Sequence, residues 1–125
     1  MSKYQKLSDI LLGLHENLPD FRGSLIASTD GLPIAHTLAT DEEVNSVAAM
    51  AAAALGLGKR ITQTLHAGSL GEMQIMGTDS QIFIYATGGR GILALMAKKG
   101  SNVGLINLEA RGAVNDISRV LEAGS

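Results

Sequence analysis

Two neighbouring segments of the chain, residues 81–87 and 92–98, are apolar at almost every position. Side chains of an extended strand point alternately to its two faces, so Phe83 and Tyr85 point to one face and Ile82 to the other. A strand that is apolar on both faces has to be covered on both faces. The sequence therefore predicts an α/β protein in which helices lie on both sides of a single sheet.

Length and composition narrow the class of protein further. A chain of 125 residues has the size of one domain, and we expect residues 1–125 to form a single domain with one core. With 46% hydrophobic and 18% charged residues, the composition is typical of a globular protein, and we find neither an export signal nor an apolar stretch of membrane-spanning length. We therefore expect a cytoplasmic protein that does not insert into membranes.

The absence of cysteine and the near-neutral charge exclude several kinds of site. Without cysteine the chain has no disulfides, no thiolate metal ligands and no cysteine nucleophile. A net charge of −2 and 3% aromatic residues provide neither a basic surface for phosphates nor a stacking platform for bases. We therefore do not expect nucleic acid as a partner.

Three segments have the periodicity of amphipathic helices, with apolar residues at steps of three and four. Thr40 and Glu43 have the spacing of a capping box, which marks the start of the second helix. The predicted helices span residues 3–18, about 41–66, and a final segment that Ser101 or Asn102 caps and that ends near residue 121.

Five short apolar runs separated by turn residues are predicted to be strands. Asp30-Gly31 favours a tight hairpin between the first two, and Pro33 favours an edge position for the second because proline has no N–H to donate. The short links imply antiparallel pairing. The predicted strands span residues 22–28, 32–38, 70–77, 81–87 and 92–98, so the element order is α-β-β-α-β-β-β-α.

Four sequence features in this order match a known family. They are the lead Phe21-Arg22-Gly23, the hairpin at residues 28–35, the Ala- and Gly-rich second helix, and the final helix after Lys98-Lys99-Gly100. The chain in this respect resembles the Roadblock and dynein light chain family, particularly its prokaryotic MglB-type members. The resemblance implies a three-layer sandwich: a five-stranded antiparallel sheet in the order 2-1-5-4-3, with the second helix on one face and the first and third helices on the other.

The resemblance also implies a partner and a function. The family typically forms homodimers that pair the third strand and the second helix across a two-fold axis, and its prokaryotic members commonly act on small Ras-like GTPases. This implies a homodimeric regulator or scaffold of a small Ras-like GTPase, without an active site of its own. Two alternatives stay open: a structural adaptor without effect on nucleotide turnover, and a small-molecule sensor with a pocket between helix and sheet.

The second helix is apolar on almost all sides. At 100° per residue, Ala49, Ala53 and Gly56 lie on the side away from the sheet, flanked by Met50 and Leu57. Small residues at steps of three and four allow another backbone to approach closely. We therefore predict an interface on this side; the alternative is an exposed Ala-rich helix without a partner.

Two groups of residues form the predicted interfaces. The third strand alternates polar and apolar residues like the half-exposed edge of a sheet, and the second helix carries a polar rim at both ends. The predicted dimer interface consists of Met50, Ala53, Leu57, Met73, Gln74, Ile75 and Met76. The predicted GTPase-binding residues are Asn45, Ala49, Ala52, Gly56, Lys59, Arg60 and Gln63.

No catalytic or metal-binding motif is recognisable in the sequence. His15, His36 and His66 do not have the spacing of metal ligands, and the glycine-rich segments 57–60 and 88–91 do not have the spacing of a P-loop. No serine lies in a nucleophile motif with histidine and carboxylate companions. We predict no catalytic residue, no metal and no cofactor.

Overall fold

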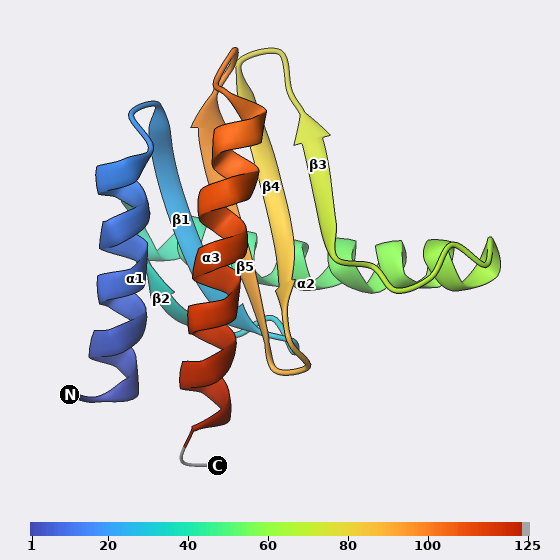
Figure 1. The fold of residues 1–125 in the computed structure, drawn as a ribbon, viewed down its shortest axis with the longest axis horizontal. Helices are drawn as coiled ribbons and strands as arrows, with labels where there is room; N and C mark the ends of the chain where they lie inside the picture. The colour runs from blue at the N-terminus through green and yellow to red at the C-terminus, as the bar shows by residue number, and fades with distance from the viewer. Residues whose placement is uncertain (124–125) are drawn as a thin grey trace.

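Residues 1–123, the part of the chain that the computed structural model describes, fold into three helices and five strands (Figure 1). Their order is α-β-β-α-β-β-β-α, as predicted. The elements are α1 (Lys3–Asn17), β1 (Phe21–Ser28), β2 (Pro33–His36), α2 (Asp41–Thr64), β3 (Glu72–Met76), β4 (Ser80–Thr87), β5 (Gly91–Lys98) and α3 (Val103–Glu122).

The strands form one antiparallel sheet in the order β2-β1-β5-β4-β3, which confirms the expected topology. This order leaves β2 and β3 at the two edges. Pro33 lies in β2, where its missing N–H removes no hydrogen bond from a central ladder. Beside it, the pairing register of β1 shifts between Ile26 and Ala27.

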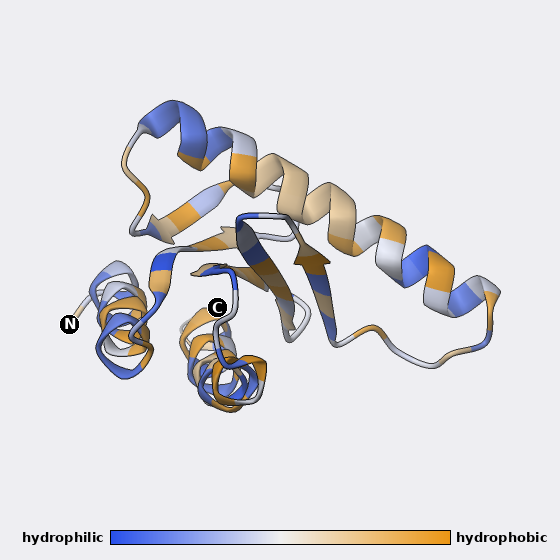
Figure 2. Cartoon of the chain, turned by 90° about the horizontal axis from the view of Figure 1, so that it is seen from above, coloured by the Kyte–Doolittle hydropathy of each residue, from blue (hydrophilic) through white to orange (hydrophobic). Residues whose placement is uncertain are grey.

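Helices cover both faces of the sheet. Figure 2 shows α2 on one face and α1 and α3 on the other. Side chains of the central strands alternate between two cores: Phe83 and Tyr85 pack in the core under α1 and α3, and Ile84 and Ile92 pack in the core under α2. The apolar character of both faces of β4 and β5 is therefore explained by burial on both sides.

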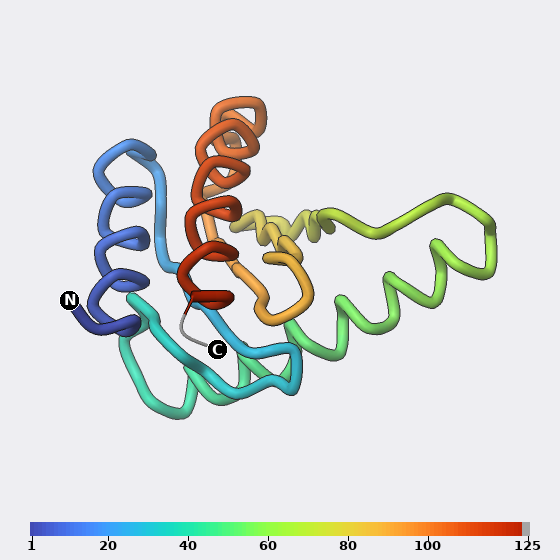
Figure 3. The backbone as a smooth tube through the Cα atoms, turned by 60° about the horizontal axis from the view of Figure 1, so that its bottom comes forward, coloured from blue at the N-terminus to red at the C-terminus, as the bar shows by residue number. Residues whose placement is uncertain are grey.

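Helix α2 crosses the sheet and extends beyond its β3 edge (Figures 1 and 3). It begins as predicted, because the Thr40 hydroxyl accepts a hydrogen bond from the N–H of Glu43 at 3.2 Å. It then runs for 24 residues to Thr64. Figures 1 and 3 show its C-terminal part extending past the edge strand β3. The last turns of α2 therefore lie beyond the sheet of their own chain.

Two edge strands are shorter than predicted. The segment predicted as 70–77 is a strand only over Glu72–Met76, and the segment predicted as 32–38 only over Pro33–His36. At the end of β2 the side-chain oxygen of Thr37 accepts the hydrogen bond from the Ser24 N–H at 2.9 Å, in the place of a ladder carbonyl. The Thr37 N–H still donates to the Ser24 carbonyl at 2.9 Å, so a side chain replaces only one of the two backbone hydrogen bonds, and the regular ladder ends at this pair.

The cap of α3 is Asn102, one of the two predicted candidates. Its Oδ1 accepts a hydrogen bond from the N–H of Leu105 at 3.1 Å. The first helix ends at Asn17, one residue before the predicted end, and Leu18 forms its cap. No helix within residues 1–123 is long and apolar enough to cross a membrane.

Candidate interaction surface

One side of α2 is buried against the sheet, as its periodicity predicts. The buried residues recur at three- and four-residue steps, which is one face of a helix. They are Val44, Ala48, Ala51, Leu55 and Gly58.

A second side of α2 exposes large apolar side chains. Met50 is 62% exposed, Leu57 59% and Ile61 50%. The spacing of seven and then four residues puts the three side chains on one side of the helix. Ala53, the remaining α2 residue of the predicted dimer interface, is exposed as well. Ile61 was absent from the predicted interface, although its position one turn after Leu57 could have identified it.

The apolar side ends in a surface hollow near the C-terminus of α2. Its volume is about 470 Å³, and it is lined by Leu57, Arg60, Ile61, Thr64 and Leu65. Arg60, predicted to bind a GTPase, therefore borders the same surface as Leu57, predicted to lie in the dimer interface.

The opposite side of α2 is partly covered by the β1–β2 turn. A Cβ atom placed on Gly31 would lie 3.3 Å from the Cα of Ala49 and 3.4 Å from the Cβ of Ala52. As a result Ala52 is only half-exposed. The other six residues of the predicted GTPase-binding group are exposed: Asn45, Ala49, Gly56, Lys59, Arg60 and Gln63.

Two glycines inside α2 have different environments. A Cβ atom on Gly58 would lie 2.7 Å from Cδ2 of Leu70 and 2.9 Å from Sδ of Met73, so the absence of a side chain allows α2 to approach the start of β3. A Cβ atom on Gly56 would have nothing within 4 Å. Glycine in a helix interior costs about 1 kcal/mol relative to alanine. Packing within residues 1–123 accounts for Gly58 and leaves Gly56 unexplained.

Strand β3 presents an open edge. Among the described residues β3 pairs only with β4, so its other edge has no strand beside it. Met73 is half-buried and packs in the core under α2, whereas Gln74, Ile75 and Met76 are exposed. Ile75 lies on the α2 side of the sheet, as Met73 does, but it is 45% exposed. The sheet ends here and α2 does not cover it at this position.

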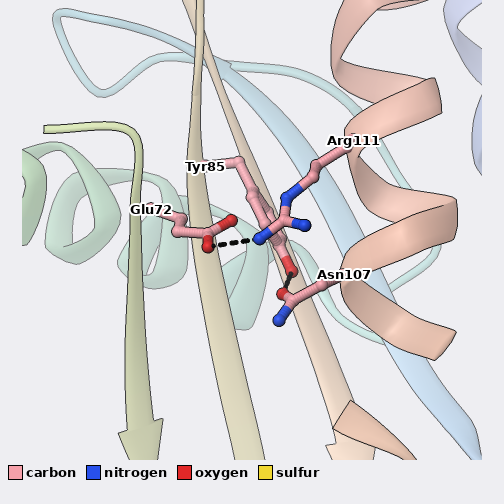
Figure 4. Close-up of polar contacts among 4 residues, drawn as sticks. All are labelled: Glu72, Tyr85, Asn107 and Arg111. Atoms are coloured by element: carbon pink, nitrogen blue, oxygen red, sulfur yellow. Dashed lines mark hydrogen bonds and ion pairs between the residues drawn. The ribbon is translucent and has the colours of Figure 1, made fainter. Parts of the chain in front are cut away.

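A polar cluster joins β3 and β4 to α3 on the other face of the sheet (Figure 4). A guanidinium N–H of Arg111 donates a hydrogen bond to the Glu72 carboxylate at 2.8 Å. The Tyr85 hydroxyl donates to Oδ1 of Asn107 at 2.7 Å. Burial, with a smaller contribution from the Glu72 charge, raises the pKa of Tyr85 well above its ordinary value of 10.0.

This cluster lies at the wall of a surface cavity of about 590 Å³. The cavity is lined by the end of α2, the segment before β3, and parts of β4 and α3, and its lining includes Thr62, Ser69, Leu70, Gly71, Tyr85 and Arg111. This cavity was not predicted from the sequence, because its residues come from four separate segments without a shared motif.

The histidines do not come together. His15 lies with its Nε2 atom 2.9 Å from the Thr37 hydroxyl and its ring edge-to-face with Phe21, at 4.3 Å between ring centroids. Burial lowers the pKa of His15 below 6.5. Within residues 1–123 no cluster of three or more histidine, aspartate and glutamate side chains could hold a metal ion.

Comparisons with known proteins are consistent with this geometry. The Roadblock/LC7 domain family matches residues 7–97. An uncharacterised protein of Methanocaldococcus jannaschii, MJ0310, is 31% identical over 108 residues, which cover 86% of this chain and 93% of that protein.

Solved structures with the same fold include two bacterial proteins. Myxococcus xanthus MglB has a TM-score of 0.86 at 14% identity, over 96% of this chain and 90% of the other. A Roadblock/LC7 domain from Streptomyces avermitilis has a TM-score of 0.86 at 18% identity, over 91% of this chain and 96% of the other. At these identities the similarity establishes the fold.

Proposed function

The chain belongs to the Roadblock/LC7 domain family, and from this premise we propose that it forms a homodimer whose α2 helices bind and regulate a small Ras-like GTPase. The observation that carries the proposal is the apolar side of α2, exposed at Met50, Leu57 and Ile61, together with the open edge of β3. Exposed apolar surface of this kind is typical of an interaction site.

The homodimer is supported by the two exposed features lying next to each other. Gly58 allows α2 to approach Met73 closely, so the C-terminal part of α2 lies next to the edge strand β3. An unpaired edge strand is an aggregation hazard unless another chain covers it. A second copy related by a two-fold axis would cover the apolar side of α2 and the edge of β3 together, because each subunit of such a dimer uses the same surface.

Light scattering coupled to gel filtration tests the dimer. We expect the mass of a dimer at tens of micromolar, and we expect Leu57→Glu to give a monomer because a buried carboxylate without a partner is costly. Leu108→Glu is the matched control, since Leu108 is 67% exposed on α3, away from the proposed interface. A monomeric wild-type chain, or equal masses for both variants, would contradict the dimer.

Binding to a GTPase is supported by the resemblance to prokaryotic MglB-type proteins and by Gly56. The glycine is exposed and lacks a neighbour within 4 Å in its own chain. Glycine destabilises a helix interior, and its presence at this position is explained if the backbone of a partner packs against it. Asn45, Lys59 and Gln63 then form a polar rim around the contact.

The test is single-turnover hydrolysis by a small Ras-like GTPase of the same genome, measured with and without this protein. Regulation predicts a changed hydrolysis or nucleotide-release rate, and Gly56→Arg is expected to weaken binding at least about tenfold, because a bulky side chain is forced into a packed contact. Gly112→Arg is the control, since Gly112 also has no neighbour within 4 Å but lies on α3. Ala52→Arg is a less clean probe, because Ala52 contacts the turn at Gly31.

Three outcomes decide between the functions. Loss of binding in Gly56→Arg with a retained dimer supports the GTPase platform. Normal binding by both Gly56→Arg and Ala52→Arg would place the contact elsewhere. If no Ras-like GTPase binds in either nucleotide state, the result would contradict GTPase regulation and favour a structural adaptor without effect on nucleotide turnover.

A second candidate function, small-molecule sensing, is favoured by the cavity of about 590 Å³, which lies within the size range of ligand pockets. Gly71 lines this cavity, and a Cβ atom there would have nothing within 4 Å, so Gly71→Phe should fill the space without displacing the fold. A metabolite that raises the melting temperature of the wild type but not of Gly71→Phe would support sensing. Equal shifts in both would contradict it.

A further inference from the structure

The surface cavity of about 590 Å³ has charged groups of both signs on its wall. Among the residues that line it, Glu72 and Arg111 are the two that carry a formal charge. They belong to different elements, β3 and α3, and Figure 4 shows their side chains pointing toward each other. The wall therefore holds one carboxylate beside one guanidinium, without an excess of either charge.

Both charged groups keep unused hydrogen-bonding capacity. A guanidinium has several N–H donors, and within residues 1–123 Arg111 uses one of them, for Glu72. The second carboxylate oxygen of Glu72 accepts no hydrogen bond from the described part of the chain. The side chains of Arg111 and Glu72 are 63% and 33% exposed, so a ligand in the cavity can reach both groups.

The rest of the wall includes apolar side chains from both cores of the protein. Leu70 and Ala86 pack against the core under α2, and Val114 packs against the core under α1 and α3. All three are half-buried and line the cavity. A Cβ atom on Gly71 would have nothing within 4 Å, so the space beside them is open. An apolar group of a ligand therefore finds apolar contacts next to the charged pair.

The charged pair discriminates against ligands that carry a single charge. An anion that binds Arg111 also lies close to the Glu72 carboxylate, because the interacting nitrogen and oxygen atoms of the two side chains are 2.8 Å apart. A cation that binds Glu72 meets the guanidinium in the same way. Since like charges at a contact are costly, a ligand gains from both groups when it carries both charges itself.

An α-amino acid carries its two charges at a matching distance. At the bond lengths of the peptide backbone, its ammonium nitrogen and the nearer carboxylate oxygen are about 3 Å apart. This is close to the 2.8 Å between the paired atoms of Arg111 and Glu72. The carboxylate can accept hydrogen bonds from the remaining guanidinium N–H groups, and the ammonium group can donate to the free carboxylate oxygen. Its side chain is then left for the apolar part of the wall.

We propose that this cavity binds a free α-amino acid with an apolar side chain, whose carboxylate contacts Arg111 and whose ammonium group contacts Glu72. The inference rests on the second candidate function, the binding of a small molecule in this cavity, and it is independent of the dimer and of the GTPase. Because Glu72 lies in the edge strand and Arg111 in α3, the ligand adds to the contacts that hold β3 beside α3.

Leucine and two analogues that each lack one charge test the proposal on the unchanged protein. Isocaproate is leucine without the ammonium group, and isopentylamine is leucine without the carboxylate. In an NMR titration of isotope-labelled protein, leucine is expected to shift the amide signals of Gly71, Glu72 and Asn115, which line the cavity. Each analogue is expected to bind at least about tenfold more weakly, because it loses one charge-assisted contact.

Two variants of the charged pair make different predictions for the same ligands. Arg111→Gln is expected to weaken leucine binding at least about tenfold, because the ligand carboxylate loses its charged partner. Glu72→Gln is also expected to weaken leucine binding, but to strengthen isocaproate binding, because the competing carboxylate is removed. Arg119→Gln and Asp116→Asn are matched controls, since these two residues form an ion pair at 3.5 Å on α3 that does not line this cavity.

The outcomes separate the class of ligand from the existence of the site. Analogues that bind as tightly as leucine, with every shift lost in Gly71→Phe, would overturn the amino acid and leave the cavity as a ligand site. Equal leucine binding by Arg111→Gln and Arg119→Gln would overturn the assigned contact. The absence of a leucine-dependent shift up to about 10 mM would overturn the proposal as well. Another metabolite that stabilises the wild type but not Gly71→Phe would still support small-molecule sensing.

Discussion

Gly31, in the turn between β1 and β2, lies against Ala49 of α2, so that a Cβ atom on the glycine would be 3.3 Å from the Cα atom of the alanine. The backbone of Gly31 also has a φ of +86°, in the left-handed region. The turn is therefore restricted to glycine by two independent causes, and its contact fixes the position of α2 relative to β1 and β2.

We expect Gly31→Ala to lower the free energy of unfolding by more than the cost of the left-handed backbone alone, which is about 1 kcal/mol. Gly68→Ala is the control, because Gly68 has a φ of +90° but no neighbour within 4 Å. Urea unfolding of both variants measures the difference. Equal losses would mean that the contact with Ala49 contributes nothing.

The glycines inside α2 should respond in opposite ways to alanine. Gly56→Ala is expected to raise the free energy of unfolding by up to about 1 kcal/mol, because alanine favours the helix and meets no neighbour. At Gly58 the new methyl group would displace the ends of the Leu70 and Met73 side chains, which offsets or exceeds this gain. Thermal unfolding of the two variants under identical conditions compares them directly, and a larger gain at Gly58 would contradict the close packing.

Most of the fold could be predicted because its signals are local. The capping spacing of Thr40 and Glu43 gave the start of α2, and Pro33 indicated an edge strand; both interpretations are confirmed. The apolar faces of β4 and β5 required cover on both sides. The ends of the edge strands were overestimated, because where a ladder stops depends on a contact such as that of Thr37 with Ser24, which no local pattern encodes.

The candidate surface could be predicted only in part. The periodicity of α2 separated its buried side from its exposed side, but it could not indicate that the turn at Gly31 covers Ala52. The pairing of Glu72 with Arg111 was also beyond the sequence, since the two residues are 39 positions apart and belong to different elements. Contacts of this kind depend on how the elements pack together.

The hydrogen bond from Tyr85 to Asn107 makes a modest contribution to stability. Tyr85→Phe removes the donor and leaves Oδ1 of the half-buried Asn107 without this partner, so we expect a loss of about 1 kcal/mol in the free energy of unfolding. Tyr4→Phe is the matched control because Tyr4 is 61% exposed. Urea denaturation at neutral pH measures both, and an equal effect of the two substitutions would contradict the role of the hydrogen bond.

The raised pKa of Tyr85 predicts a loss of stability at high pH. In the unfolded chain the phenol loses its proton near 10.0, whereas the folded protein keeps it protonated to a higher pH. Above pH 10 the unfolded state therefore binds fewer protons, and stability falls as the pH rises. The part of this decline due to Tyr85 should be absent in Tyr85→Phe, and an unchanged profile in that variant would argue against the burial of the hydroxyl.

His15 predicts the opposite behaviour at low pH. Burial lowers its pKa in the folded protein below the 6.5 of the unfolded chain, so between these two values the unfolded state binds more protons. Its contribution to stability is therefore complete above pH 6.5 and is lost as the pH falls through 6.5 toward the folded pKa. His15→Gln removes the titrating group while keeping a side chain able to bond to the hydroxyl of Thr37. Urea unfolding at several pH values between about 5.5 and 8 should give a flatter profile for this variant than for the wild type, within the range where histidine titrates. If the two profiles run parallel, protonation of His15 is not coupled to folding, and its half-buried position against Thr37 and Phe21 does not persist in solution.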